Sequence, residues 1–127
     1  MKIVRFNQST AHTNAAKTSR AHEYPIGDGD IDCAFVHVDG EYPGGGKFAR
    51  NTISKEVLFV VKGGGAVELK NGKNDVEESA KAHKFGQFDV IFIDAGEIYR
   101  ITTDAEGASF AISCTPPWSP DQAESVD

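Results

Sequence analysis

Residues 44–63 read GGGKFARNTISKEVLFVVKG. Val57 to Val61 is a continuous apolar run, which is typical of a strand that is buried on both faces. The glycines at 44–46 predict a turn before this strand, and Gly63-Gly64-Gly65 predicts its end. The stretch therefore predicts a strand in the middle of a β-sheet, with a sharp turn on each side.

Short runs of β-favouring residues, separated by turn residues, make up much of the remaining chain. The other predicted strands are Ile31 to Val38, Ala66 to Lys70, Phe88 to Ile93, Tyr99 to Thr103 and Ala108 to Cys114, with one short edge strand within residues 1–20. Asn71-Gly72 predicts a hairpin turn, while residues 73–84 fit either a strand pair with a loop or a short helical segment. Because no long helix is indicated, the sequence predicts an all-β sandwich or barrel.

The length and composition agree with one small domain. The chain has 127 residues, of which 39% are hydrophobic and 25% are charged, and a chain of this size buries enough surface for one hydrophobic core. We expect residues 1–115 to form this domain. Residues 116–127 begin with prolines, which cannot continue a strand ladder because they lack the donor, and end in an acidic tail that we expect to be mobile.

Charge, hydropathy and cysteine content argue against several classes of protein. The net charge of −6 disfavours nucleic-acid binding, which needs clustered Lys and Arg. No apolar run approaches the ~18 residues that cross a membrane, and the opening residues, MKIVRFNQSTAHTN, lack the apolar segment of a signal peptide. Cys33 and Cys114 lie in β-like runs and are expected to be reduced and packed. We therefore expect a cytoplasmic protein that binds neither nucleic acid nor membrane.

Two spaced motifs connect these strands to a known family. The first is Gly44-x5-Arg50-x-Thr52-x3-Glu56-x6-Gly63, and the second is Phe88-x5-Asp94-x-Gly96-x2-Tyr99. Their intervals resemble the two motifs of the cupin superfamily, which carry a Gly, two His, a Glu and a Gly and, further on, a third His. The resemblance covers about residues 31–115. It implies a double-stranded antiparallel β-barrel of the cupin or jelly-roll type, with a pocket at one mouth.

The resemblance also implies that four positions of these motifs face the pocket and, in most cupins, bind a metal ion. Only Glu56 keeps a ligand residue, whereas Arg50, Thr52 and Tyr99 stand where histidines are expected. A guanidinium cannot ligate a metal, a threonine hydroxyl is a weak ligand, and a tyrosine ligates only as the phenolate, starting from a pKa near ~10. We therefore expect a small cupin with degenerate metal-binding motifs that carries no metal and no other cofactor.

The residues at these positions allow two interpretations. Arg50 and Glu56 either form an ion pair that fills the vacated site, or Arg50 offers its bidentate fork to a carboxylate, a phosphate or a sugar. Thr52 and His37 are further candidates for ligand binding. His37 reaches the pocket only if the face that it shares with Phe35 points inward, and the opposite face of that strand is equally apolar.

Two functions remain open. The first is binding of a small polar or anionic molecule, such as a sugar, a sugar acid or a carboxylate, in the barrel pocket. The alternative is a metal-independent isomerase, epimerase or lyase, in which Glu56 is the base and Tyr99 the acid of a general acid–base pair. Trp118 is interpreted as a clamp over the barrel or as a dimer contact. Exposed strand edges, together with the resemblance, lead us to expect a homodimer.

Overall fold

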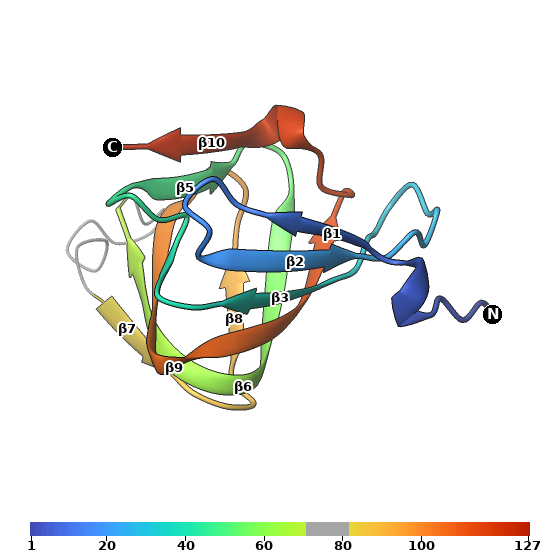
Figure 1. The fold of residues 1–127 in the computed structure, drawn as a ribbon. Coiled ribbons are helices and arrows are strands. Elements are labelled where there is room, and N and C mark those ends of the chain that lie inside the picture. Colours follow the sequence, from blue (N-terminus) through green and yellow to red (C-terminus); the bar gives the residue numbers. More distant parts are fainter. Residues whose placement is uncertain (71–81) are drawn as a thin grey trace.

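Strands account for most of the chain in the computed structural model, which describes residues 1–70 and 82–127 (Figure 1). They are β1 (Thr10–Thr13), β2 (Ser19–Glu23), β3 (Ala34–Val38), β4 (Glu41–Tyr42), β5 (Phe48–Asn51), β6 (Lys55–Leu69), β7 (Ala82–Phe85), β8 (Val90–Ile93), β9 (Ile98–Thr115) and β10 (Ala123–Val126). Within these described residues, two short 3-10 helices accompany the strands, η1 (Phe6–Gln8) and η3 (Pro120–Gln122). The hairpin turn expected at Asn71-Gly72 and most of the open stretch 73–84 lie outside the described residues.

The two longest strands, β6 and β9, hold the barrel together. They pair antiparallel from Lys55↔Thr115 to Leu69↔Tyr99, with two irregularities in the register. β7 and β8 pair with β6, while β3, β4 and β5 pair with β9, and all of these pairings are antiparallel. The curled sheet in Figure 1 is the double-stranded antiparallel β-barrel that the sequence predicted. Within the described residues, no helix has the length and apolar character needed to cross a membrane.

A bend at glycines lets β6 and β9 curl together. The sequence predicted that the strand ends at Gly63-Gly64-Gly65, but β6 continues to Leu69 and shifts its register against β9 on both sides of Gly63. Gly63 has φ +83°, and a Cβ at this position would lie 2.2 Å from the carbonyl oxygen of Gly107. A side chain at Gly63 would therefore push the two strands apart, so the glycine bends the strand instead of ending it.

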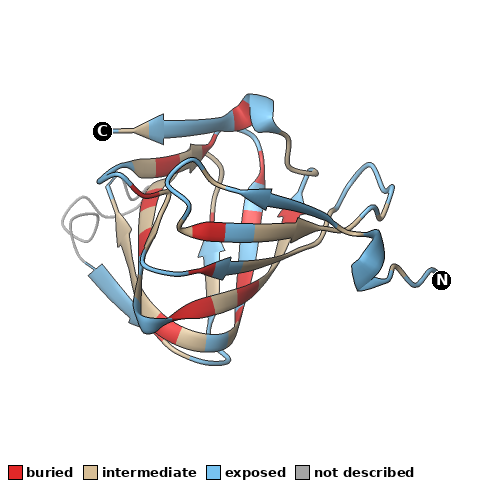
Figure 2. Ribbon diagram, in the orientation of Figure 1, coloured by how far each residue is buried: buried red, intermediate tan, exposed pale blue. Residues whose placement is uncertain are grey.

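The hydrophobic core lies on the inner face of the barrel alone. Along the first half of β6, Leu58 and Val60 are 2% and 0% exposed, whereas Val57 and Phe59 between them are 42% and 40% exposed. Figure 2 shows this alternation of buried and exposed residues along the strands. The prediction that Val57 to Val61 is buried on both faces is therefore wrong, because in the part of the chain that the structure describes no second layer covers the outer face.

The acidic end of the chain is part of the sheet. β9 ends at Thr115, immediately before the prolines, as the sequence predicted. Beyond them, β10 pairs antiparallel with β5, and the amide oxygen of buried Gln122 accepts hydrogen bonds from the backbone N–H groups of Ile53 and Ser54 at 3.1 and 2.7 Å. The expectation of a mobile tail is wrong, because the side chain of Gln122 and the pairing with β5 hold this segment.

Candidate functional site

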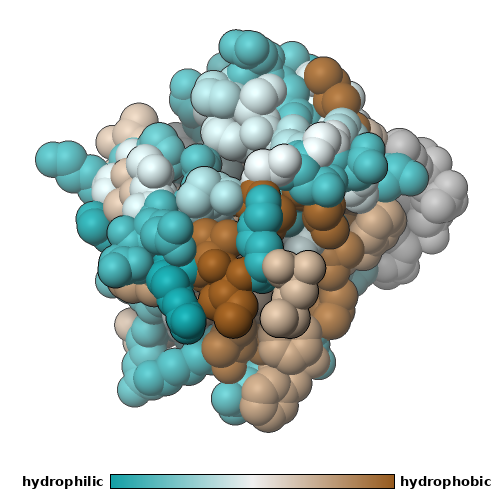
Figure 3. Space-filling model, turned by 90° about the vertical axis from the view of Figure 1, so that its right-hand side faces the viewer, coloured by the Kyte–Doolittle hydropathy of each residue, from teal (hydrophilic) through white to brown (hydrophobic). Residues whose placement is uncertain are grey.

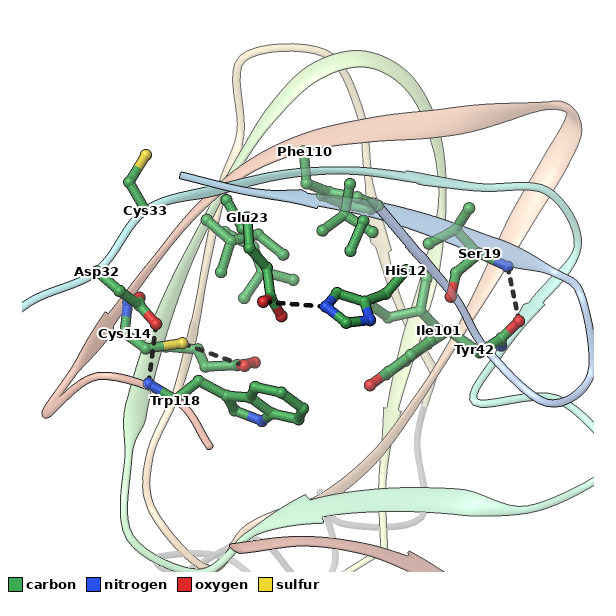
Figure 4. Close-up of a pocket in the computed structure, with 18 of the residues that line it drawn as sticks. His12, Ser19, Glu23, Asp32, Cys33, Tyr42, Ile101, Phe110, Cys114 and Trp118 are labelled. Atoms are coloured by element: carbon green, nitrogen blue, oxygen red, sulfur yellow. Dashed lines mark hydrogen bonds and ion pairs between the residues drawn. The ribbon is translucent and has the colours of Figure 1, made fainter. Parts of the chain in front are cut away.

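A cavity of about 540 Å³ opens inside the barrel (Figure 4). Strands β1, β2, β3, β4, β6 and β9 line it, together with the segment 117–120. Its apolar wall is made by Val36, Val38, Leu58, Ile101, Phe110 and Ile112. Its polar groups gather in two places, one around Glu56 on β6 and one around His12 on β1. This volume is typical of cavities that bind small molecules.

Glu56 is a buried carboxyl group at the centre of the first polar cluster. It is 8% exposed. Its Oε2 accepts a hydrogen bond from the hydroxyl of Tyr99 at 3.3 Å, and its Oε1 accepts one from the thiol of Cys114 at 3.4 Å. Its alternation with Lys55 and Val57 along β6 turns it inward. The structure thus brings together Glu56 and Tyr99, the two residues proposed as an acid–base pair.

Burial raises the pKa of Glu56 above that of an exposed glutamate, because the low-dielectric interior penalises the carboxylate. Hydrogen bonds with Cys114, Asn51 and Tyr99 oppose this rise, while the nearby charge of Asp32 adds to it. Among the described residues, the ion pairs of Arg and Lys do not include Glu56. A carboxyl group that is buried without a cation is costly, and such groups cluster at functional sites.

Two tyrosines complete the polar cluster. The rings of Tyr42 and Tyr99 are stacked, with centroids 6.2 Å apart. Burial, followed by the charge of Glu56, raises the pKa of Tyr42 to about 12 and that of Tyr99 well above its ordinary value. Both phenols therefore remain protonated near neutral pH and act as hydrogen-bond donors.

Trp118 is held at the edge of the cavity by two hydrogen bonds. Its indole N–H donates to Oδ1 of Asn51 at 3.1 Å, and its backbone N–H donates to Oδ2 of Asp32 at 2.8 Å. The same carboxylate accepts from the backbone N–H of Cys114 at 2.9 Å, which fixes the end of β9 to the segment that carries Trp118. Figure 4 shows the indole ring lying against the open space of the cavity. Trp118, which the sequence analysis interpreted as a clamp over the barrel or a dimer contact, is thus part of the cavity wall.

The second polar cluster comes from the hairpin of β1 and β2. His12 on β1 and Glu23 on β2 both line the cavity, and Nε2 of His12 lies 3.3 Å from Oε2 of Glu23. In the view of Figure 4, this pair lies across the open space from Cys114 and Trp118. The cavity therefore has titratable groups on two of its walls.

The structure does not bring Arg50 and Thr52 into this cavity. Ala49 and Asn51 are the buried residues of β5, so Arg50 between them points away and forms an ion pair with Glu124 on β10, in which its Nε lies 2.9 Å from the carboxylate. The ion pair between Arg50 and Glu56, one of the two interpretations of these positions, is therefore not formed. Thr52 is exposed, and its hydroxyl donates to the backbone oxygen of Gln122 at 3.4 Å. Asn51, which lies between the motif positions 50 and 52, is the residue that points inward and is buried.

His37 also lies outside the cavity. Its neighbours Val36 and Val38 line the cavity, so the alternation of β3 turns His37 outward, where its Nδ1 lies 2.9 Å from the hydroxyl of Ser109. Both faces of this strand carry apolar residues, and the sequence alone left the choice open. The structure settles it in favour of the Val36 face.

Several site residues carried no sequence signal. The residues that the motifs missed are His12, Glu23, Asp32, Tyr42 and Cys114. They come from strands and loops that are distant in sequence, and no interval between them identifies a site. Within residues 1–70 and 82–127, no three His, Cys, Asp and Glu side chains are grouped so that they could hold a metal ion. The metal-free state of the protein stays a prediction.

No protein-family model matches the sequence, and no curated protein matches it. Solved structures match its fold. A Streptomyces PAC13 variant with uridine has a TM-score of 0.79 and 14% identity, over 99% of this chain and 90% of that one. The polyketide cyclase RemF from Streptomyces resistomycificus has a TM-score of 0.69 and 17% identity, over 94% and 82%. KdgF from a Halomonas species has a TM-score of 0.69 and 10% identity, over 94% and 96%.

At these identities the likeness concerns the fold. The neighbours are proteins of the cupin fold. Together with the strand order and the cavity inside the barrel, they identify this chain as a small cupin-fold protein, as the spacing of its two motifs had indicated.

Proposed function

We propose that the barrel cavity binds a small, uncharged molecule that carries hydroxyl groups and a planar ring. The observation that carries this proposal is the chemistry of the lining. Three carboxyl groups, those of Glu23, Asp32 and Glu56, line the cavity, and none of its lining residues within the described chain is a lysine or an arginine. An anionic ligand would meet carboxylates without a compensating cation, which is unfavourable in a partly buried site. The proposal therefore keeps the polar ligand that the sequence suggested and replaces the anionic one.

The ring of the proposed ligand follows from the shape of the wall. Trp118 and the stacked Tyr42 and Tyr99 border a mainly aliphatic surface, and flat apolar groups gain most from such contacts. The hydroxyl groups of the ligand would exchange hydrogen bonds with Glu56 and the tyrosine hydroxyls. PAC13, which is described as a nucleoside dehydratase and whose structures contain uridine, makes nucleosides a reasonable first set of probes.

A thermal-shift screen tests this proposal. The panel contains uridine and other nucleosides, neutral sugars, and sugar acids as the anionic counterpart. A ligand at 100 times its Kd stabilises the folded state by about 2.7 kcal/mol, so binding is visible as a rise in Tm. We expect neutral ring-bearing compounds to raise the Tm of the wild type, and Trp118→Ala to reduce this rise.

Arg50→Lys is the matched control, because Arg50 pairs with Glu124 outside the cavity. It should respond to ligands as the wild type does. If only sugar acids stabilise the wild type, and Arg50→Lys abolishes that effect, the uncharged-ligand proposal is wrong and the site lies at Arg50.

A catalytic role is the second candidate, and the burial of Glu56 beside the hydroxyl of Tyr99 favours it. A buried carboxyl group with a raised pKa, in contact with the hydroxyl of Tyr99, is the arrangement that general acid catalysis uses. The reaction classes are isomerisation, epimerisation and elimination on a hydroxylated molecule, which need proton transfers at two atoms. Incubation of each stabilising compound in D₂O, followed by NMR, detects deuterium incorporation or loss of a hydroxyl group. Glu56→Gln should retain the thermal shift and lose this turnover.

A further inference from the structure

The His12–Glu23 pair lies in the same cavity as Glu56, on the hairpin of β1 and β2. In this hairpin Thr10 lies opposite Glu23 and His12 lies opposite Ala21. Residues that face each other across an antiparallel pair share one side of the sheet. His12, Ala21 and Glu23 are therefore on the side that lines the cavity, whereas His22 points to the other side and packs against the ring of Phe6 at 4.8 Å.

The hairpin is fixed at the end that follows His12. Oδ1 of Asn14 accepts hydrogen bonds from the backbone N–H groups of Thr18 and Ser19 at 2.8 and 3.0 Å, which closes the turn between the two strands. Nδ2 of Asn14 donates to the backbone oxygen of Pro43 at 2.9 Å. This second bond ties the turn to the chain that follows β4. β1 is an edge strand, but its end is anchored, and the side chains of His12 and Glu23 meet at the rim of the cavity, where they are 59% and 42% exposed.

We propose that His12 is a second proton-transfer residue of the cavity and that Glu23 positions its ring. This inference rests on the proposed function of the cavity. Nε2 of His12 contacts the carboxylate of Glu23, and an N–H at Nε2 leaves a lone pair on Nδ1. Nδ1 is then the atom that accepts a proton from a bound molecule, and Glu23 stabilises the imidazolium that forms. This is the role that carboxylates have beside catalytic histidines.

Glu56 and His12 then have complementary roles in an elimination reaction. Nδ1 of His12 takes a proton from a carbon atom of the substrate, and the electron pair of that C–H bond forms the new C=C bond. The neighbouring C–O bond breaks, and the leaving hydroxyl takes the proton of the Glu56 carboxyl group and departs as water. The enzyme ends with His12 protonated and Glu56 ionised, and one proton passes through solvent from His12 to Glu56 to restore it. No co-reactant is required.

The binding part of this inference is tested by NMR of protein with ¹⁵N-labelled histidine and tryptophan side chains, with uridine as the probe. Trp118 Nε1 reports occupancy of the cavity, and His12 reports contact with β1. His22 and His37, which lie outside the cavity, are internal controls. We expect uridine to shift the signals of Trp118 and His12 and to leave both controls unchanged. We also expect His12 to be the Nε2–H tautomer when it is neutral, and Glu23→Gln to mix its tautomers.

The outcomes separate this inference from the proposed function. If Trp118 shifts and His12 does not, the cavity binds uridine without the participation of β1, and the role of His12 is refuted while the proposed function stands. If neither shifts, both proposals fail for nucleosides. If His12 shifts, the D₂O assay decides the catalytic part. His12→Gln should keep the thermal shift and lower kcat about 10²–10⁴-fold, and absence of turnover with every compound of the panel would refute a proton-transfer role.

Discussion

The two faces of β6 carry similar residues and have different surroundings. On the inner face, Leu58 and Val60 are 2% and 0% exposed, and Glu56 reaches the cavity. On the outer face, Val57 and Phe59 are 42% and 40% exposed. An apolar run in the sequence therefore does not show whether one face or both faces of the strand are buried in the monomer. The inner face forms the core and the site, while the outer face has no cover among the described residues.

The outer face continues onto the neighbouring strand. Phe88, Val90 and Phe92 are 67%, 57% and 57% exposed, and the rings of Phe59 and Phe88 lie 6.3 Å apart. β6 and β8 pair directly, with Phe59 opposite Val90, so these side chains form one surface, which we call the outer β6–β8 face. Figure 3, which looks at the molecule from another side of the barrel, also shows apolar side chains gathered between hydrophilic ones. Contiguous apolar surfaces of this kind often mark protein–protein contacts.

The largest expected effect is a difference in the free energy of unfolding between variants of the inner face and variants of the outer face of β6. Leu58→Ala leaves a hole in the core and should cost about 2–5 kcal/mol. The matched change on the outer face, Val57→Ala, should cost about 0.5 kcal/mol or less in the monomer, because surface substitutions are nearly neutral. Urea denaturation at low protein concentration measures both. Equal losses for the two variants would mean that something covers the outer face in solution.

A smaller loss is expected at the bend that separates the two halves of β6. Gly63→Ala introduces a Cβ in a left-handed backbone conformation and against the oxygen of Gly107, and strain of this kind costs about 1–3 kcal/mol. Gly86→Ala is the control, because a Cβ there meets nothing within 4 Å. The same denaturation experiment compares them. A Gly63→Ala variant as stable as the control would show that the two strands can separate at the bend without loss.

The third prediction concerns the expected homodimer, which we propose forms through the outer β6–β8 face. A charge placed there should disrupt association and leave the monomer folded. Light scattering should give the wild type about twice the chain mass of 13.7 kDa, and the Phe59→Asp/Phe92→Asp variant the mass of one chain. Phe6→Asp, on an exposed residue of η1, is the control and should remain a dimer. A wild type that is monomeric at micromolar concentration contradicts the proposal.

Much of the fold was predictable from the sequence because the patterns that indicate strands and turns are local in the sequence. Alternation, glycines and the two spaced motifs were enough to predict the all-β barrel and to find Glu56 and Tyr99. The orientation of a strand whose two faces are both apolar was not predictable, which left the side of His37 open and led to the wrong prediction that Val57 is buried. The placement of Arg50 in the cavity was wrong for another reason. Its partner Glu124 lies on β10, and no local pattern indicated that the end of the chain returns to pair with β5.

The site was predictable only where it coincided with the motifs. Residues of β1, β2, β3, β4, β6, β9 and the segment 117–120 line the cavity, so most of them become neighbours only after the sheet has curled. His12 lies in a polar stretch of the sequence, and no motif spacing connects it with Glu56. Glu56 and Tyr99, the two buried titratable residues that the sequence analysis singled out, were found because they stand at positions of the two spaced motifs.

The smallest expected effect is a pH dependence of the free energy of unfolding. It should come from Glu56 on the inner face of β6, and substitutions on the outer face should leave it unchanged. Because burial raises the pKa of Glu56 in the folded protein, the folded state holds its proton at pH values where the unfolded chain has lost it. The stability that this proton contributes is complete below the pKa of an ordinary glutamate, about 4.3. It is lost as pH rises from there through the raised pKa of the folded state, with a slope of at most about 1.4 kcal/mol per pH unit.

Glu56→Gln removes this titration and should therefore gain stability relative to the wild type as pH rises through the same window. Tyr99→Phe sharpens the test. The hydrogen bond from Tyr99 lowers the pKa of Glu56, so its removal should extend the loss of stability to higher pH. Urea denaturation at a series of pH values measures all three proteins, and Val57→Ala on the outer face should run parallel to the wild type. If the wild type and Glu56→Gln also run parallel, Glu56 has the same proton affinity in the folded and unfolded states. A buried, protonated carboxyl group would then no longer be available as the acid of the cavity.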